Sequence, residues 1–238
     1  MSTAQPPPAR RPAPATVPTC ALRIRGLRFR YGDEGPWTVD IAECTLAPGE
    51  QALLTGSSGS GKSTLLQLVA GLLDPRQGSV EIAGEEIHAL RGAQRDLFRG
   101  RHVGMIFQTF QLLPGFTAIE NVMLALLAAQ HPRREHRPRA KALLDDLGIE
   151  RHDAPVEQLS VGQQQRVAVA RAVACRPTLV LADEPTASLD PENAIGAMDL
   201  IQETCRERGA PLLCTSHDPA MRDRFERVMP IAAGRTAT

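Results

Sequence analysis

Residues 56–64, with the sequence GSSGSGKST, combine glycine, lysine and hydroxyl side chains at the spacing that binds nucleotide phosphates. They fit the pattern G-x-x-x-x-G-K-[ST] in full. Glycines allow successive backbone N–H groups to point inward, which forms a nest for a phosphate at the start of a helix. We expect Lys62 to place its charge on the β- and γ-phosphates, Ser63 to offer a hydroxyl to Mg²⁺ and Thr64 to reach the α-phosphate. The predicted phosphate-binding residues are Gly56, Ser57, Ser58, Gly59, Ser60, Gly61, Lys62, Ser63 and Thr64.

Two adjacent acids, Asp183 and Glu184, end the apolar segment LVLADEP. In enzymes with such a phosphate loop, the first acid at the end of a strand lies beside Mg²⁺, so Asp183 is a predicted metal residue. Glu184 is expected to point toward the γ-phosphate, where a carboxylate polarises or deprotonates the attacking water. The two segments together predict Mg²⁺-dependent hydrolysis of a nucleotide γ-phosphate.

A second segment suited to an anion is LSVGQQQR, residues 159–166. Ser160 is a good N-cap, and Gln163 stands three residues later, where a capping box places Glu or Gln. Gly162 leaves the backbone open in the first turn. The pattern predicts a helix that begins after Ser160 and presents its N-terminus to a negative charge.

The elements that must position these residues follow an α/β order. Apolar residues 51–56 predict a strand directly before the phosphate loop, and residues 62–73 predict the helix after it. From Ala21, apolar and basic residues alternate with period two, as in a half-exposed antiparallel strand. Later strands alternate with helices, which predicts a largely parallel sheet.

Between approximately residues 91 and 160, the apolar spacing is helical. We interpret this segment as an inserted α-helical subdomain, in which the Pro- and Arg-rich residues 131–139 join two helices. The expected fold class is therefore α/β. It consists of a P-loop NTPase core with a mostly parallel sheet, an N-terminal antiparallel β subdomain and the inserted helical subdomain.

Composition argues against several other classes of protein. The chain has 27 basic and 27 acidic side chains among 238 residues, whereas a dedicated nucleic-acid binder carries a basic excess. Five scattered cysteines form no C-x-x-C pair, which argues against a disulfide framework or a zinc site. No apolar run approaches the ~20 residues of a membrane helix, and the N-terminus lacks the apolar core of a signal peptide. Residues 1–20 are rich in proline and are predicted to form a disordered tail before a single domain, residues 21–238.

A series of motifs makes the chain resemble the nucleotide-binding subunits of ABC transporters over roughly residues 22–235. In chain order, the matches are Tyr31 (the adenine-stacking aromatic), 56–64 (Walker A), Gln108 (Q-loop), 159–163 (signature motif), 179–185 (Walker B), 187–190 (D-loop) and His217 (H-loop). The soluble DNA-repair and chromosome-structure ATPases share these motifs but carry long coiled coils or zinc modules between Walker A and the signature. That interval is short here and lacks C-x-x-C.

The resemblance implies that two copies form a head-to-tail homodimer, with each ATP between the Walker A of one subunit and the signature motif of the other. Ser160, Gly162 and Gln163 would then contact the ATP of the partner subunit. It also implies catalytic roles for Glu184, His217 and Gln108. His217 would contact the γ-phosphate, and Gln108 would approach Mg²⁺ or the water and link that state to the helical subdomain. Asp190 would run along the dimer interface, and Tyr31 would stack on adenine.

The family also implies a separate transmembrane permease, driven by ATP-dependent dimerisation, and a cytoplasmic, peripheral location on the inner face of the cell membrane. The segments FQTFQLLPGFTAIENV and LSVGQQQR are most similar to the branch that serves lipoprotein release and macrolide-type efflux. An alternative within the family is an ATPase that regulates cell division or cell-wall remodelling through a membrane partner that transports nothing. Val161 departs from the glycine that is usual at this position. Because a β-branched residue tolerates negative φ far better than positive φ, we expect a helical or extended backbone there.

Overall fold

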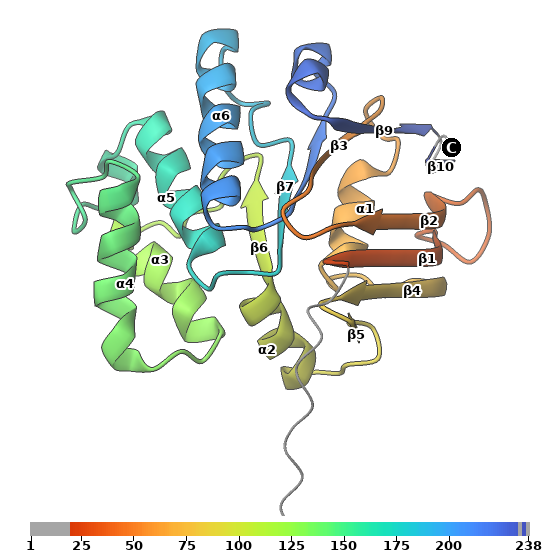
Figure 1. The fold of residues 1–238 in the computed structure, drawn as a ribbon, viewed down its shortest axis with the longest axis horizontal. Helices are drawn as coiled ribbons and strands as arrows, with labels where there is room; N and C mark the ends of the chain where they lie inside the picture. The colour runs from red at the N-terminus through yellow and green to blue at the C-terminus, as the bar shows by residue number, and fades with distance from the viewer. Residues whose placement is uncertain (1–19, 233–234, 237–238) are drawn as a thin grey trace, which may run out of the picture.

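The structure, a computed structural model, describes residues 20–232 and 235–236. Apart from Cys20, the tail predicted at residues 1–20 lies outside the described residues. Across the described residues, ten strands form one sheet in the order β5-β4-β1-β2-β10-β9-β3-β8-β7-β6 (Figure 1). An antiparallel part of this sheet meets a mostly parallel part, as the predicted fold class requires.

The antiparallel part of the sheet comes from the first third of the chain. β1 (Leu22–Phe29) pairs with β2 (Val39–Leu46) on one side and with β4 (Gln77–Ile82) on the other. β5 (Glu85–Glu86) pairs with β4 at the edge. The apolar side chains of β1 are buried while two of its arginines are exposed, which confirms the period-two alternation.

The parallel part of the sheet carries the chemistry. Its strands are β3 (Gln51–Thr55), β6 (Val103–Phe107), β7 (Leu179–Asp183), β8 (Leu212–Ser216) and β9 (Arg227–Ala232). Neighbouring strands in the order β9-β3-β8-β7-β6 all run parallel. β10 (Arg235–Thr236) pairs with both β9 and β2 and so joins the two parts. The carboxyl ends of β3, β7 and β8 therefore meet at one edge, where ligands bind in open α/β sheets.

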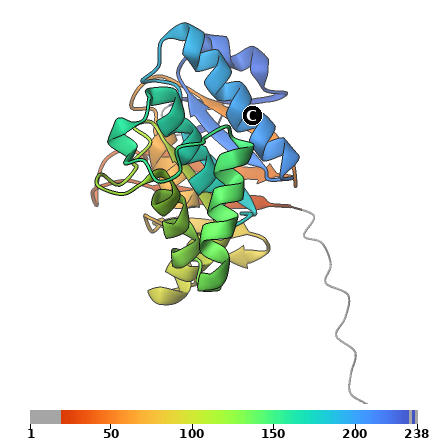
Figure 2. The ribbon, with the colours of Figure 1, turned by 90° about the vertical axis from the view of Figure 1, so that its left-hand side faces the viewer.

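Helices cover the sheet and extend beyond it. Their bounds are α1 (Lys62–Val69), α2 (Ala93–His102), α3 (Ala118–Ala128), α4 (Arg133–Asp146), α5 (Val161–Val173) and α6 (Pro191–Glu207), with short 3₁₀ helices at Val156–Gln158 and Pro219–Arg224. α3, α4 and α5 gather beyond β6, away from the antiparallel strands (Figure 1, Figure 2). None of the helices in the described part of the chain combines the length and the apolar character needed to cross a bilayer.

Two details differ from the helical interpretation of residues 91–160. Strand β6 lies inside that segment and pairs with β7 along its whole length. Gly104 permits this position, because a Cβ there would lie 2.3 Å from the carbonyl oxygen of Ala172. The Pro- and Arg-rich residues predicted to join two helices instead form the first half of α4, with Pro138 inside the helix. Residues 136, 140, 143 and 144 of α4 are buried on one face, and that amphipathic face holds the helix together despite the proline.

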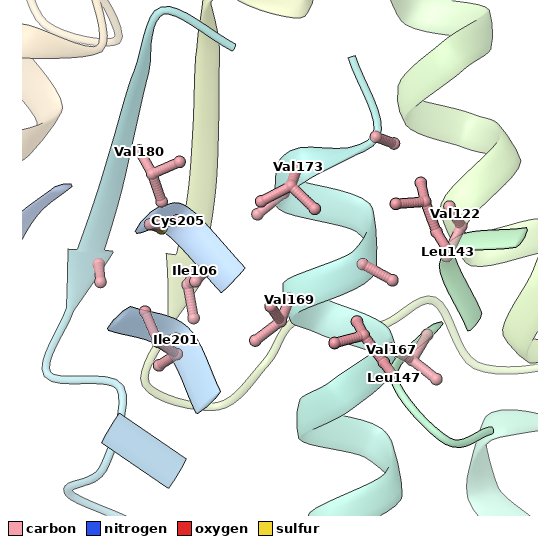
Figure 3. Close-up of a cluster of buried hydrophobic side chains, with 14 of the residues drawn as sticks. Ile106, Val122, Leu143, Leu147, Val167, Val169, Val173, Val180, Ile201 and Cys205 are labelled. Atoms are coloured by element: carbon pink, nitrogen blue, oxygen red, sulfur yellow. The ribbon is translucent and has the colours of Figure 1, made fainter. Parts of the chain in front are cut away.

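Helix α5 lies between the sheet and the helices beyond it. Val169 and Val173 point toward Ile106 of β6 and toward α6, whereas Val167 points toward α3 and α4 (Figure 3). All three valines are at most 1% exposed, and each contributes roughly 1.5 kcal/mol or more by leaving water. This packing on both sides fixes the position of the helix N-terminus that begins at Ser160.

Candidate active site

The phosphate loop joins β3 to α1 and needs glycine at two positions. A Cβ on Gly56 would lie 2.5 Å from the carbonyl oxygen of Ile231, and a Cβ on Gly61 would lie 2.3 Å from that of Thr38. Gly61 also has a φ of 95°, which favours glycine. Gly61 is the N-cap of α1 and no side chain caps this helix. The first N–H groups of α1 are therefore available to a phosphate.

Lys62 is buried at this loop, where its ammonium group contacts two carbonyl oxygens and one carboxylate. Its Nζ donates to the carbonyl oxygens of Gly56 (2.9 Å) and Ser57 (3.1 Å) and lies 3.4 Å from Oε1 of Glu184. The side chain is only 4% exposed, and a charge at that depth needs such partners. An anionic phosphate would compete for the same ammonium group.

Ser63 and Asp183 meet across the site as expected for a metal pair. The Ser63 hydroxyl donates to Oδ1 of Asp183 at 3.0 Å, although the two residues come from α1 and β7. A hydroxyl and a carboxylate are the hard oxygen ligands that Mg²⁺ prefers. The donor set therefore fits Mg²⁺.

Glu184 and His217 form a second pair beside Lys62. His217 Nδ1 lies 2.6 Å from Oε2 of Glu184. Glu184 has a φ of 44°, a left-handed backbone that costs a non-glycine residue roughly 1–3 kcal/mol and occurs mainly where function demands it. Each oxygen of the Glu184 carboxylate therefore contacts one basic side chain, Lys62 at Oε1 and His217 at Oε2.

A cavity of about 570 Å³ brings most of the predicted residues together. Its lining consists of Tyr31, Thr38, Ser58, Gly59, Ser60, Gly61, Lys62, Ser63, Thr64, Gln108, Glu184 and His217. Gly56, Ser57 and Asp183 adjoin this set through their hydrogen bonds to Lys62 and Ser63. The Oγ of Ser60 is buried without a hydrogen-bond partner among the described residues, which suits a site that receives a further polar group.

Tyr31 and Thr38 also line this cavity. Tyr31 is 67% exposed, packs edge-on against Phe29 and shares a 3.0 Å hydrogen bond with the hydroxyl of Thr64. Its exposed ring is available for stacking. Thr38 was not predicted, because its part in the cavity is the approach of its carbonyl to Gly61, and a backbone carbonyl has no sequence signature.

The predicted signature residues and Asp190 do not line this cavity. Ser160 accepts from the N–H of Gln163 and Gln163 Oε1 accepts from the N–H of Ser160, so the predicted capping box is confirmed. Val161 is the first residue of α5, is 54% exposed and has no positive φ, which confirms the backbone expected there. Gly162 has open space around it. Asp190 instead caps α6 by accepting from the N–H of Asn193.

Gln108 follows β6. The residues after Gln108 are held by a contact that the sequence did not reveal. Phe110 and Gln111 have φ values of 58° and 46°. The guanidinium of Arg171, on α5, donates to the carbonyl oxygens of both residues at 2.7 and 2.5 Å. Ser188 also donates to the carbonyl of Gln108 at 3.1 Å. The Q-loop is thus tied to the helix that begins at the signature motif.

Comparisons with known proteins agree with this geometry. The sequence model described as "ABC transporter" matches residues 39–187. The lipoprotein-releasing system ATP-binding protein LolD 1 of Caulobacter vibrioides is 42% identical over 91% of this chain and 94% of its own length. The uncharacterized ABC transporter ATP-binding protein YbbA of Escherichia coli K12 is 42% identical over 81% of this chain and 85% of its own.

Solved structures show the same fold. The dimeric cassette MJ0796, bound to ADP and Pi in a post-hydrolysis state, superposes with a TM-score of 0.78 at 31% identity, covering 91% of this chain and 97% of that one. CbiO1 of Clostridium perfringens, part of the ABC transporter complex cbiONQ, superposes with a TM-score of 0.81 at 28% identity, covering 92% and 88%.

Proposed function

The chain belongs to the ABC transporter family as an ATP-binding and ATP-hydrolysing subunit, and from that premise we propose that it drives a separate permease of the lipoprotein-releasing type. The observation that carries this proposal is the end-to-end similarity to LolD proteins. Those of Caulobacter vibrioides and Pseudomonas syringae are each 42% identical, over 94% and 96% of their own lengths. The subunit would lie on the cytoplasmic face of the membrane, where the permease holds it.

Two copies of the chain would complete the ATP sites. Ser160, Gly162 and Gln163 lie at the exposed N-terminus of α5 and outside the cavity of their own subunit. A helix N-terminus attracts an anion, and a second copy of the chain offers one when ATP fills its cavity. The dimeric MJ0796 structures support this arrangement, in which Asp190 would lie at the interface.

ATP would occupy the cavity with its phosphates on the loop at residues 56–64 and its adenine on Tyr31. Lys62 would turn from the carbonyls of Gly56 and Ser57 to the β- and γ-phosphates, because these bear full negative charge. Mg²⁺, held by Ser63, Asp183 and Gln108, would neutralise charge on the phosphate oxygens. The hard oxygen donors of this set support the assignment.

Glu184 would act as the general base. When Lys62 turns to the phosphates, the carboxylate loses its ion pair with Nζ and can accept a proton from the attacking water. The water oxygen bonds to the γ-phosphorus, the bond to the β-phosphate oxygen breaks, and ADP and phosphate leave. His217, 2.6 Å from the same carboxylate, would keep it in register and contact the γ-phosphate.

Isolation of the native complex tests this function. The tagged full chain should co-purify from membranes with a permease, and the purified complex in proteoliposomes should release a lipoprotein only with ATP. The matched control is the complex with Lys62→Ala, which should assemble but release nothing. A purified complex that hydrolyses ATP without releasing any lipoprotein would refute the assignment, as would capture of a cell-division protein.

A further inference from the structure

Thr215 connects both acids of the active site through one hydroxyl group. It lies on β8 opposite Asp183 of the neighbouring strand β7. Its Oγ1 lies 2.8 Å from Oδ1 of Asp183 and 2.9 Å from the backbone N of Glu184. The side chain is fully buried, so water does not compete for these two bonds.

The donors in this arrangement are determined by the groups present. The N–H of Glu184 can only donate, so the Thr215 oxygen accepts from it. A threonine hydroxyl has a single proton, and that proton is therefore donated to Asp183. Oδ1 of Asp183 also receives the hydroxyl of Ser63 at 3.0 Å. One carboxylate oxygen is thereby fixed from two sides, by β8 and by α1.

The second bond of Thr215 supports a strained residue. Glu184 has a φ of 44° and precedes Pro185, and both a non-glycine side chain and a following proline disfavour a left-handed or helical backbone. Without an acceptor for its N–H, Glu184 would leave a polar group unpaired inside the protein. Thr215 removes that penalty and so favours the conformation that points the carboxylate at His217 and Lys62.

We propose that Thr215 is a positioning residue for ATP hydrolysis, which holds the Asp183 carboxylate and the Glu184 backbone in register through its hydroxyl. This inference rests on the proposed roles of Asp183 beside Mg²⁺ and of Glu184 as the base. It goes beyond the family motifs, none of which includes residue 215.

A pair of substitutions separates the hydroxyl from the shape of the side chain. Thr215→Val keeps the volume and removes the hydroxyl, whereas Thr215→Ser keeps the hydroxyl and removes a methyl group. We expect Thr215→Val to lower kcat about 10- to 100-fold, because each lost bond involves a charged group or a strained backbone. Thr215→Ser should stay within about threefold of the wild type. Thr204→Val, at a buried threonine of α6, is the matched control and should not change kcat.

A second measurement does not depend on turnover. Affinity for a non-hydrolysable ATP analogue is measured by calorimetry with Mg²⁺ and with EDTA. Thr215→Val should leave the affinity in EDTA unchanged and reduce the gain that Mg²⁺ brings, because Asp183 is no longer held in place. A merely structural role of Thr215 would change both affinities together.

Several results would overturn the proposal. They are a kcat for Thr215→Val within twofold of the wild type, an equal loss in Thr215→Ser, or an unchanged gain from Mg²⁺ in Thr215→Val. Glu184→Gln, tested in parallel, distinguishes this failure from a failure of the proposed function. Loss of turnover in Glu184→Gln with normal turnover in Thr215→Val would refute only the role of Thr215, whereas normal turnover in both would refute the base itself.

Discussion

Substitution of Arg171 by methionine is expected to slow ATP hydrolysis without weakening ATP binding. Arg171 lies two turns or more from the N-terminus of α5 and does not line the nucleotide cavity. It donates to the carbonyls of Phe110 and Gln111, which follow Gln108 by two and three positions and have a left-handed backbone. Methionine fills a similar space but donates no hydrogen bond, so the segment should relax and Gln108 should lose its place.

The structure sets the size of this effect. Two hydrogen bonds from a charged donor contribute about 1.5 kcal/mol each at the lower end of their range, or about 3 kcal/mol together. Only part of this free energy is lost from the transition state, because the relaxed loop still places Gln108 in the active position for part of the time. At 1.36 kcal/mol for each factor of ten, we expect kcat to fall about 10- to 100-fold. Burial lowers the pKa of Arg171, but an arginine pKa stays far above neutral pH and the charge persists.

Arg166 provides a matched control on the same helix. Its guanidinium donates to a single carbonyl, that of Leu147, at 2.9 Å, and not to the segment that follows Gln108. Arg166→Met should lower the melting temperature by a few degrees, for a loss of about 1.5 kcal/mol, and leave kcat unchanged. Arg171→Lys should retain part of the activity, because one ammonium group can satisfy one of the two carbonyls.

The assay is steady-state phosphate release together with calorimetric ATP affinity for each variant. Combination with Gln108→Ala supplies a double-mutant cycle. If Arg171 acts through Gln108, the double variant should be no slower than Gln108→Ala alone. Independent, additive losses in the double variant would refute the reasoning, and so would an equal slowing in Arg166→Met.

Two further predictions concern the proposed chemistry, and a third concerns the core. Glu184→Gln should bind ATP, abolish turnover and accumulate an ATP-bound dimer on size-exclusion chromatography; near-normal steady-state ATPase activity would exclude Glu184 as the base. Ser160→Arg should impair hydrolysis while the ATP affinity of the isolated monomer stays nearly the same, because this residue would contact the partner's ATP; an equal loss of monomer affinity would contradict the composite site. Burial raises the pKa of the Cys205 thiol to about 12, and this side chain on α6 is 0% exposed. Cys205 should therefore stay protonated at pH 7.5 and react with iodoacetamide only after unfolding; mass spectrometry that finds it alkylated in the native protein would contradict this burial.

Features that depend only on residues close together in the sequence were predictable from the sequence. The phosphate loop, the capping box at Ser160 and the alternation in β1 each need only short-range spacing, because they follow from the hydrogen bonds and periodicity of a single element. The negative φ at Val161 follows in the same way, from the shape of one side chain. The meeting of Ser63 with Asp183 was also predictable, since strands of a parallel sheet end at a common edge.

Tertiary structure decided the features that join distant segments. β6 is a strand because β7, more than seventy residues later, supplies its hydrogen-bond partners. The Pro- and Arg-rich start of α4 is helical because its buried face has a core to pack against. Thr215 and Arg171 are ordinary residues in the sequence, and their importance comes from contacts at separations of 31 and 60 positions. Spacing along a chain reports the geometry of one element, whereas a hydrogen bond between elements exists only once the hydrophobic core has fixed where each element lies.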